Sequence, residues 1–70
     1  MTNVDFHNVV DVSVKHVHKY TGGWGDGDSY TIAFHILDSK NEIYQLTIYT
    51  QKAEVVEQLN TANLVIDEVA

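Results

Sequence analysis

Residues 30–49 read YTIAFHILDSKNEIYQLTIY. Large apolar side chains occupy alternate positions on both sides of a polar centre, the pattern of two β-strands that each bury one face. We predict strands over 29–37 and 42–49, joined by a three-residue hairpin loop with Asn41 in the left-handed region. The predicted pairs are Asp38 with Glu42, Ile36 with Tyr44, Phe34 with Leu46, and Ile32 with Ile48. The turn chemistry and the apolar alternation choose the same register, and each supports the other.

A longer strand is predicted before this hairpin, over 6–20. Its even positions form the more apolar face: Val10, Val12, Val14, His16, His18 and Tyr20. Its odd positions are mostly polar, so the pattern predicts a strand with one buried face. All four glycines of the chain lie between Thr21 and Asp28. They end the strand and permit positive φ in the loop that follows.

One helix is predicted after the hairpin. Thr50 is the expected N-cap, and apolar residues follow at helical spacing: Ala53, Val55, Val56 and Leu59. Polar residues over 60–63 end the helix, and 64–69 forms either a short fourth strand or a helical tail, of which we favour the strand. The predicted fold is a single α+β domain, 1–70, with a three-stranded antiparallel β-meander and one α-helix packed on its even face.

The charge balance narrows the classes of partner. Ten acidic residues face four basic ones, all of them lysine, and the net charge is -6. Arginine is the usual side chain for reading phosphates and guanine edges, and a negative chain repels a nucleic-acid backbone. We therefore expect no direct nucleic-acid binding and no binding to an anionic membrane surface. The acidity either serves solubility alone or attracts a basic protein.

The chain has no cysteine, which excludes disulfides and thiolate metal sites and fits a reducing compartment. No apolar run approaches the roughly 18 residues that span a bilayer. The N-terminal residues lack the basic-then-apolar order of a signal peptide. The expected location is cytoplasmic.

His16 and His18 are the candidate metal ligands. Their H-x-H spacing puts two imidazoles on one strand face, and neutral imidazole binds several transition metals well. The predicted register sets His16 opposite Phe34, in apolar surroundings that offer no third ligand. Asp26 or Asp28 would reach His18 only if the loop folded back. A metal- or small-ligand-binding domain that uses these histidines and the loop acids is the alternative hypothesis.

The sequence shows no catalytic constellation. The serines lie in strands or turns without a partnered base. The glycine-rich loop has no basic residue and joins two antiparallel strands, so it matches neither a P-loop nor a dinucleotide-binding turn. We predict that the chain is not an enzyme and needs no cofactor.

Two surfaces are candidates for binding a partner. Trp24, near the tip of the glycine-rich loop and followed by Asp26 and Asp28, combines an apolar anchor with a negative rim, although it could instead fold back as a lid over the core. The other surface is the odd face of the sheet, where Val17 is expected beside Ala33 and Thr47, with Tyr49 nearby. Mixed polar and apolar faces of this kind often bind a second copy or another protein.

These patterns favour a non-enzymatic protein–protein interaction module. We expect it to be a homo-oligomer, specifically a homodimer that forms through the odd face or a strand edge. Seventy residues bury only a modest core, so a second copy would add stability. In its brevity, acidity and lack of signature motifs the chain resembles small phage or mobile-element accessory proteins. That resemblance rests on no particular residue, and it implies an inhibitor of a basic host protein.

Overall fold

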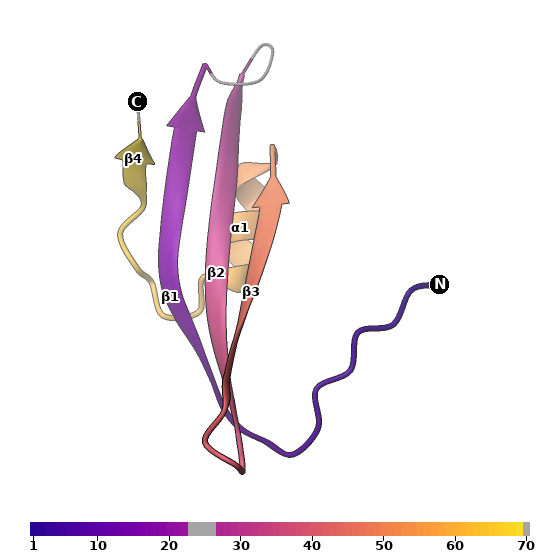
Figure 1. Cartoon of the computed structure of the whole chain (residues 1–70). Coiled ribbons are helices and arrows are strands. Elements are labelled where there is room, and N and C mark those ends of the chain that lie inside the picture. The colour runs from indigo at the N-terminus through magenta and orange to yellow at the C-terminus, as the bar shows by residue number, and fades with distance from the viewer. Residues whose placement is uncertain (23–26, 70) are drawn as a thin grey trace.

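The computed structural model describes residues 1–22 and 27–69 as a mixed sheet with one short helix (Figure 1). The elements are β1 (Val9–Thr21), β2 (Asp28–Asp38), β3 (Ile43–Thr50), α1 (Ala53–Leu59) and β4 (Asp67–Val69). The strand order is β3-β2-β1-β4. The first three strands are antiparallel neighbours, and β4 runs parallel to β1. The α+β class is therefore as predicted, with a fourth strand that is shorter than expected.

The β2–β3 hairpin has the predicted register, with Ile36 opposite Tyr44 and each following pair in step. Asn41 adopts φ 64°, the left-handed conformation that Asn tolerates better than most residues. The Asp38 amide donates to the Glu42 carbonyl at 3.0 Å. The Asp38 Oδ1 atom accepts from the amides of Lys40 and Glu42 at 2.9 and 3.0 Å. Local side-chain chemistry thus closes the turn.

The register of β1 differs from the prediction, because Val14 and not His16 lies opposite Phe34, and because two extra residues, Val10 and Lys15, interrupt the pairing with β2. Val14 lies opposite Phe34, but His16 lies opposite Ala33, so Lys15 is left over as a β-bulge. A bulge moves every later side chain to the other face. The prediction that Val10 to Tyr20 keep their even positions on one face is therefore wrong beyond Val14.

The bulge decides which residues form the core. Val17 lies opposite Ile32 and is 1% exposed, although we expected it on the odd face. Together with Val56 of α1, these two residues are the centre of the core. Partly buried apolar side chains pack around them: Val14, Tyr30, Phe34, Ile48, Leu59 and Leu64. We call the side of the sheet that carries α1 the helix-side face and the other side the open face.

α1 covers only part of the helix-side face. It has seven residues, whereas β1, β2 and β3 have 13, 11 and 8. At the hairpin end, Val12, Tyr44 and Leu46 remain exposed, so the prediction that all even positions are buried is wrong there. On the open face Thr31 and Ala33 are buried, because they lie in β2 with strands on both sides.

The ends of α1 also differ in detail from the prediction. Lys52 is the N-cap residue and makes no side-chain cap bond. Thr50, the predicted cap, instead accepts a hydrogen bond from the Lys52 amide at 3.0 Å through its Oγ1 atom. The helix ends at Asn60, whose amide donates to the Val56 carbonyl at 2.8 Å. The Asn60 side chain bonds both backbone groups of Leu64, which directs the chain toward β4.

Candidate partner-binding surfaces

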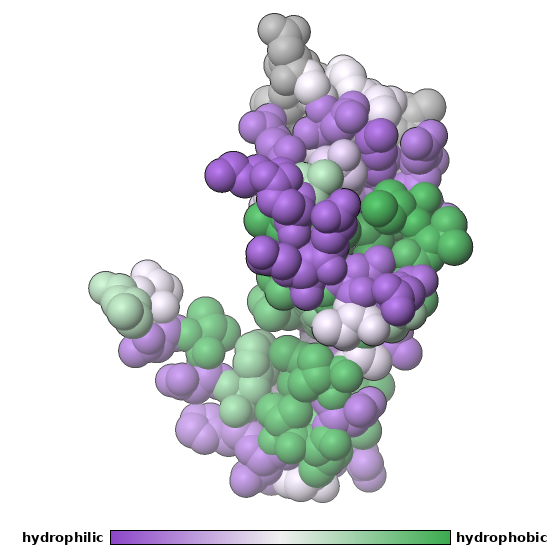
Figure 2. Space-filling view, turned by 180° about the vertical axis from the view of Figure 1, so that it is seen from behind, coloured by the Kyte–Doolittle hydropathy of each residue, from purple (hydrophilic) through white to green (hydrophobic). Residues whose placement is uncertain are grey.

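The hairpin end of the helix-side face carries a group of apolar side chains that α1 does not reach. We call Phe6, Val12, Ile36, Tyr44 and Leu46 the apolar patch. Val12, Tyr44 and Leu46 are 57, 41 and 38% exposed, around a buried Ile36. The Phe6 ring lies against Tyr44, with ring centroids 5.7 Å apart. Figure 2 shows this face, with hydrophobic residues gathered at the end of the sheet away from the grey loop atoms.

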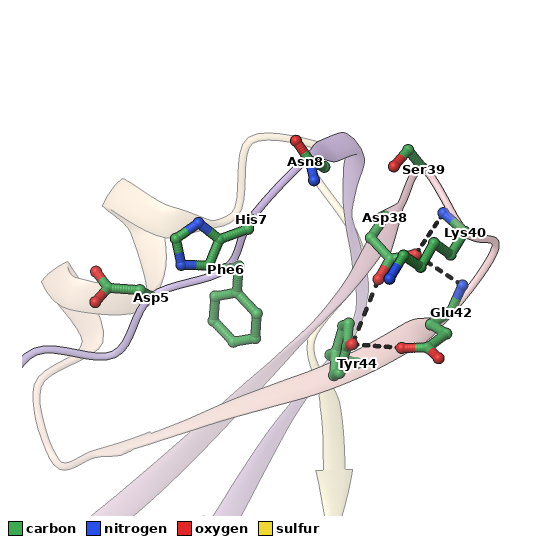
Figure 3. A pocket seen from close by; sticks show the side chains of 9 residues that line it. All are labelled: Asp5, Phe6, His7, Asn8, Asp38, Ser39, Lys40, Glu42 and Tyr44. Carbon is green, nitrogen blue, oxygen red and sulfur yellow. Dashed lines mark hydrogen bonds between the residues drawn. The ribbon is translucent and has the colours of Figure 1, made fainter.

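A hollow of about 320 Å³ lies beside the patch. Figure 3 shows its lining, contributed by the N-terminal segment and the β2–β3 hairpin: Asp5, Phe6, His7, Asn8, Asp38, Ser39, Lys40, Glu42 and Tyr44. Three of these side chains are carboxylates and one is a lysine. The rim of the apolar patch is therefore negative on balance.

Hydrogen bonds hold two carboxylates of this rim, those of Asp38 and Glu42. The Tyr44 hydroxyl donates to Glu42 Oε2 at 2.6 Å, and it also lies 3.4 Å from Asp38 Oδ2. The Glu42 amide, with the Lys40 amide and the Tyr44 hydroxyl, lowers the pKa of Asp38. The hydrogen bond to Glu42 raises the pKa of Tyr44 to about 12. At neutral pH Asp38 is thus charged and Tyr44 keeps its proton.

The open face carries a column of rings along β1, placed there by the bulge. The rings of His16 and His18 stack with centroids 4.5 Å apart and planes at 18°. Tyr20 meets His18 edge-on at 6.2 Å, and its hydroxyl lies 3.5 Å from His18 Nδ1. The carboxylate of Asp67 in β4 lies 4.0 Å from His18 Nε2. The Nδ1 atom of His16 is buried, with no hydrogen-bond partner in the described part of the chain.

This column brings together the two histidines singled out from the sequence, but not a metal centre. Over residues 1–22 and 27–69, no group of three potential ligands is close enough to hold a metal ion. Asp28, one of the loop acids proposed as a further ligand, lies 3.5 Å from Lys19 Nζ. Lys19 pairs with Tyr30, so this ion pair belongs to the helix-side face, away from the histidines.

The structure treats the other residues that were predicted to contact a partner one by one. Trp24 and Asp26 lie outside the described residues. Val17 is buried and is withdrawn from the candidate surface. Tyr49 lies on the open face as predicted and is 78% exposed.

The alternation of apolar residues did not predict the apolar patch, although the sequence carries two signals for it. The predicted helix pattern spans only 53–59, which is too short to cover the strands it packs on. Phe6 carried a second signal, because it is an apolar residue at an even position, where the strand predicted over 6–20 begins.

Comparison with known proteins adds no family: no family, no curated protein and no solved structure matches the chain. In the part of the chain that the structure describes, no helix has the length and apolar character needed to cross a membrane. The surfaces themselves are therefore the basis for a functional proposal.

Proposed function

We propose that this chain is a non-enzymatic protein-interaction module that binds a basic protein through the apolar patch. The observation that carries the proposal is the short helix, which leaves the hairpin end of an apolar sheet face uncovered. Monomeric proteins rarely keep a contiguous apolar face in water, and such faces usually mark interaction sites. A partner that buries Val12, Tyr44 and Leu46 would complete the cover that α1 begins.

Charge selects the kind of partner. The net charge is -6, and Asp5, Asp38 and Glu42 line the hollow beside the patch. Because its pKa is lowered, Asp38 stays charged well into the acid range. A negative rim around an apolar centre speeds association with a basic surface and disfavours acidic competitors. The partner expected on this surface presents apolar side chains flanked by lysine or arginine.

The test is affinity capture from the native host with wild-type protein and two serine variants. Val12→Ser changes the patch, whereas Val65→Ser changes an exposed valine of the α1–β4 connection. We expect a basic protein that binds wild type and Val65→Ser, is lost with Val12→Ser, and dissociates faster as salt rises. A protein that binds all three equally would exclude the patch as its binding site.

Trp24 remains a second predicted contact, and the same assay separates it from the patch. The loop that contains Trp24 joins Thr21 to Asp28, whereas the patch surrounds the opposite end of β2. If the loop is the main contact, Trp24→Ala weakens partner binding by roughly 2 kcal/mol while Val12→Ser has little effect. The reverse ranking supports the patch.

A further inference from the structure

The two edges of the sheet are built differently. On one side, β4 pairs with residues 18–20 of β1 and covers that end of the strand. The rest of the β1 edge is irregular, with register shifts at Val10 and Lys15. It also carries the charges of Asp11 and Lys15. Irregular and charged edges resist pairing with another strand.

The β3 edge has none of these protections. Ile43–Thr50 contains no charged residue and no proline, and its pairing with β2 is regular from end to end. Within the described residues no strand lies on its outer side (Figure 1). The N-terminal segment leaves the sheet on this side, but it is exposed throughout and forms no strand there. A regular, uncharged edge with large apolar side chains is the kind that pairs with another strand.

The hairpin shows which backbone groups are free on this edge. The bond from the Asp38 amide to the Glu42 carbonyl makes that pair a hydrogen-bonded one. In an antiparallel ladder the hydrogen-bonded pairs alternate with non-bonded ones. The even residues of β3 therefore bond to β2. The odd residues direct their amides and carbonyls to the outside: Ile43, Gln45, Thr47 and Tyr49.

We propose that β3 strands of two copies pair antiparallel across a twofold axis at Leu46, so that two four-stranded sheets become one of eight strands. This register uses every free backbone group of the edge. On the open face it sets Ile43 opposite Tyr49 and Gln45 opposite Thr47 of the second copy. On the helix-side face it sets Tyr44 opposite Ile48, and Leu46 opposite itself. Most of these pairs join β-branched, aromatic or other large side chains, which are common in strands and pack well across neighbouring strands.

The strand that pairs with the β3 edge is that of a second copy, because the edge is complementary to itself. A chain with a net charge of -6 repels its own copies, but β3 contributes no charge to the contact. The register also sets Glu42 opposite the uncharged Thr50 of the second copy, so no like charges face each other at either end of the paired strands. The core adds a reason, because only five hydrophobic residues are buried in the part of the chain that the structure describes: Val17, Ile32, Ala33, Ile36 and Val56.

The dimer has a consequence for the helix-side face. A twofold axis perpendicular to the sheet keeps both helices on the same side, so the two apolar patches meet at their Leu46 side chains. The inference goes beyond the binding of a basic partner and stands without it, because it rests on the β3 backbone and not on the exposure of the patch.

Amide hydrogen exchange along β3 tests the pairing directly. In a monomer the even amides bond to β2 and exchange slowly, while the odd amides have no partner and exchange fast. We expect the amides of Ile43, Gln45, Thr47 and Tyr49 to be protected at high protein concentration and to lose that protection on dilution. Fast exchange of the odd amides at every concentration overturns the proposal. Protection that does not change with concentration also overturns it, and assigns the edge to the chain's own N-terminal segment.

A proline variant provides the second test. Thr47 directs its amide outward, so Thr47→Pro removes no bond to β2 but blocks the centre of the interface. We expect Thr47→Pro to be a folded monomer by light scattering and circular dichroism, and Thr47→Val, which keeps the amide, to be a dimer. A dimeric, folded Thr47→Pro, or a monomeric wild type at high micromolar concentration, overturns the proposal. If Thr47→Pro fails to fold, the exchange pattern of the wild type decides whether the β3 strands pair.

Loss of basic-partner binding by Val12→Ser is measured separately from dimer formation. The binding proposal and the dimer proposal can therefore fail independently of each other.

Discussion

At the scale of single residues, Val17 and Val12 share a strand and a face but not an environment. Val17 is 1% exposed beneath α1, whereas Val12 is 57% exposed. We expect Val17→Ala to lower the free energy of unfolding by about 2 kcal/mol, since it removes buried methyl groups and leaves a cavity. Val12→Ala serves as the control and is expected to change it by about 0.5 kcal/mol. Urea denaturation measures both, and equal losses would contradict the bulged register.

Asp38 makes stability depend on pH. Backbone donors hold its pKa below the ordinary value of 3.8. Its contribution is therefore present above that value and is lost as pH falls through the lower pKa of the folded state. We expect Asp38→Asn to be less stable than wild type at neutral pH but to lose less stability on acidification below 3.8. Ser39→Ala, an uncharged change in the same turn, should keep the wild-type slope in thermal melts.

His16 and His18 allow a direct test of the metal alternative. Their rings stack at 18°, so the ring nitrogens do not converge on one point, and a zinc site needs three or four convergent ligands. We expect the thermal midpoint to be the same in EDTA and in added zinc. A rise of several degrees in zinc that disappears in His18→Asn would instead support the ligand-binding hypothesis.

At the scale of elements, the bulge in β1 has a testable position. Like Val10 near the start of the strand, Lys15 has no partner in β2. Its deletion would leave Val14 opposite Phe34 and Val17 opposite Ile32, with regular pairing from Asp11 onward. We expect this deletion to change the free energy of unfolding by no more than about 1 kcal/mol.

Deletion of Ser13 is the matched control. Without Ser13, the strand can keep Val12 opposite Ile36 and His16 opposite Ala33 only if Lys15 moves opposite Phe34. That move places Lys15 on the apolar helix-side face. Burying a charge without a partner is costly. Chemical denaturation should therefore rank the Ser13 deletion well below the Lys15 deletion. The opposite ranking would show that the extra residue lies elsewhere in β1.

At the scale of the whole molecule, the small core and the bare β3 edge predict a stability that depends on concentration. If the folded chain is a dimer, mass action raises the thermal midpoint as protein concentration rises. We expect that rise for wild type and for Thr47→Val. Thr47→Pro should melt at one temperature whatever the concentration. A wild-type midpoint that is constant over a hundredfold dilution would show that folding gains nothing from a second copy.

Local sequence determined the hairpin, the spacing of the helix and the α+β class, because each depends on residues that are close along the chain. The turn around Asn41 sets the β2–β3 register by itself. The position of Tyr49 on the open face was likewise predicted from the alternation of residues along the strand. Only part of the candidate surface followed from these patterns, since Phe6 and Tyr44 meet across the fold and are distant in sequence.

Tertiary structure alone decided the features on which the proposed function rests. The bulge at Lys15 exists only relative to β2, and no pattern within β1 reveals it, yet it buries Val17 and places His16 and His18 on the open face. The parallel pairing of β4 requires the chain to cross the sheet after α1. The apolar patch depends on where a seven-residue helix comes to rest. These outcomes are set by which distant surfaces meet, and alternation along one strand carries no information about its partner's register.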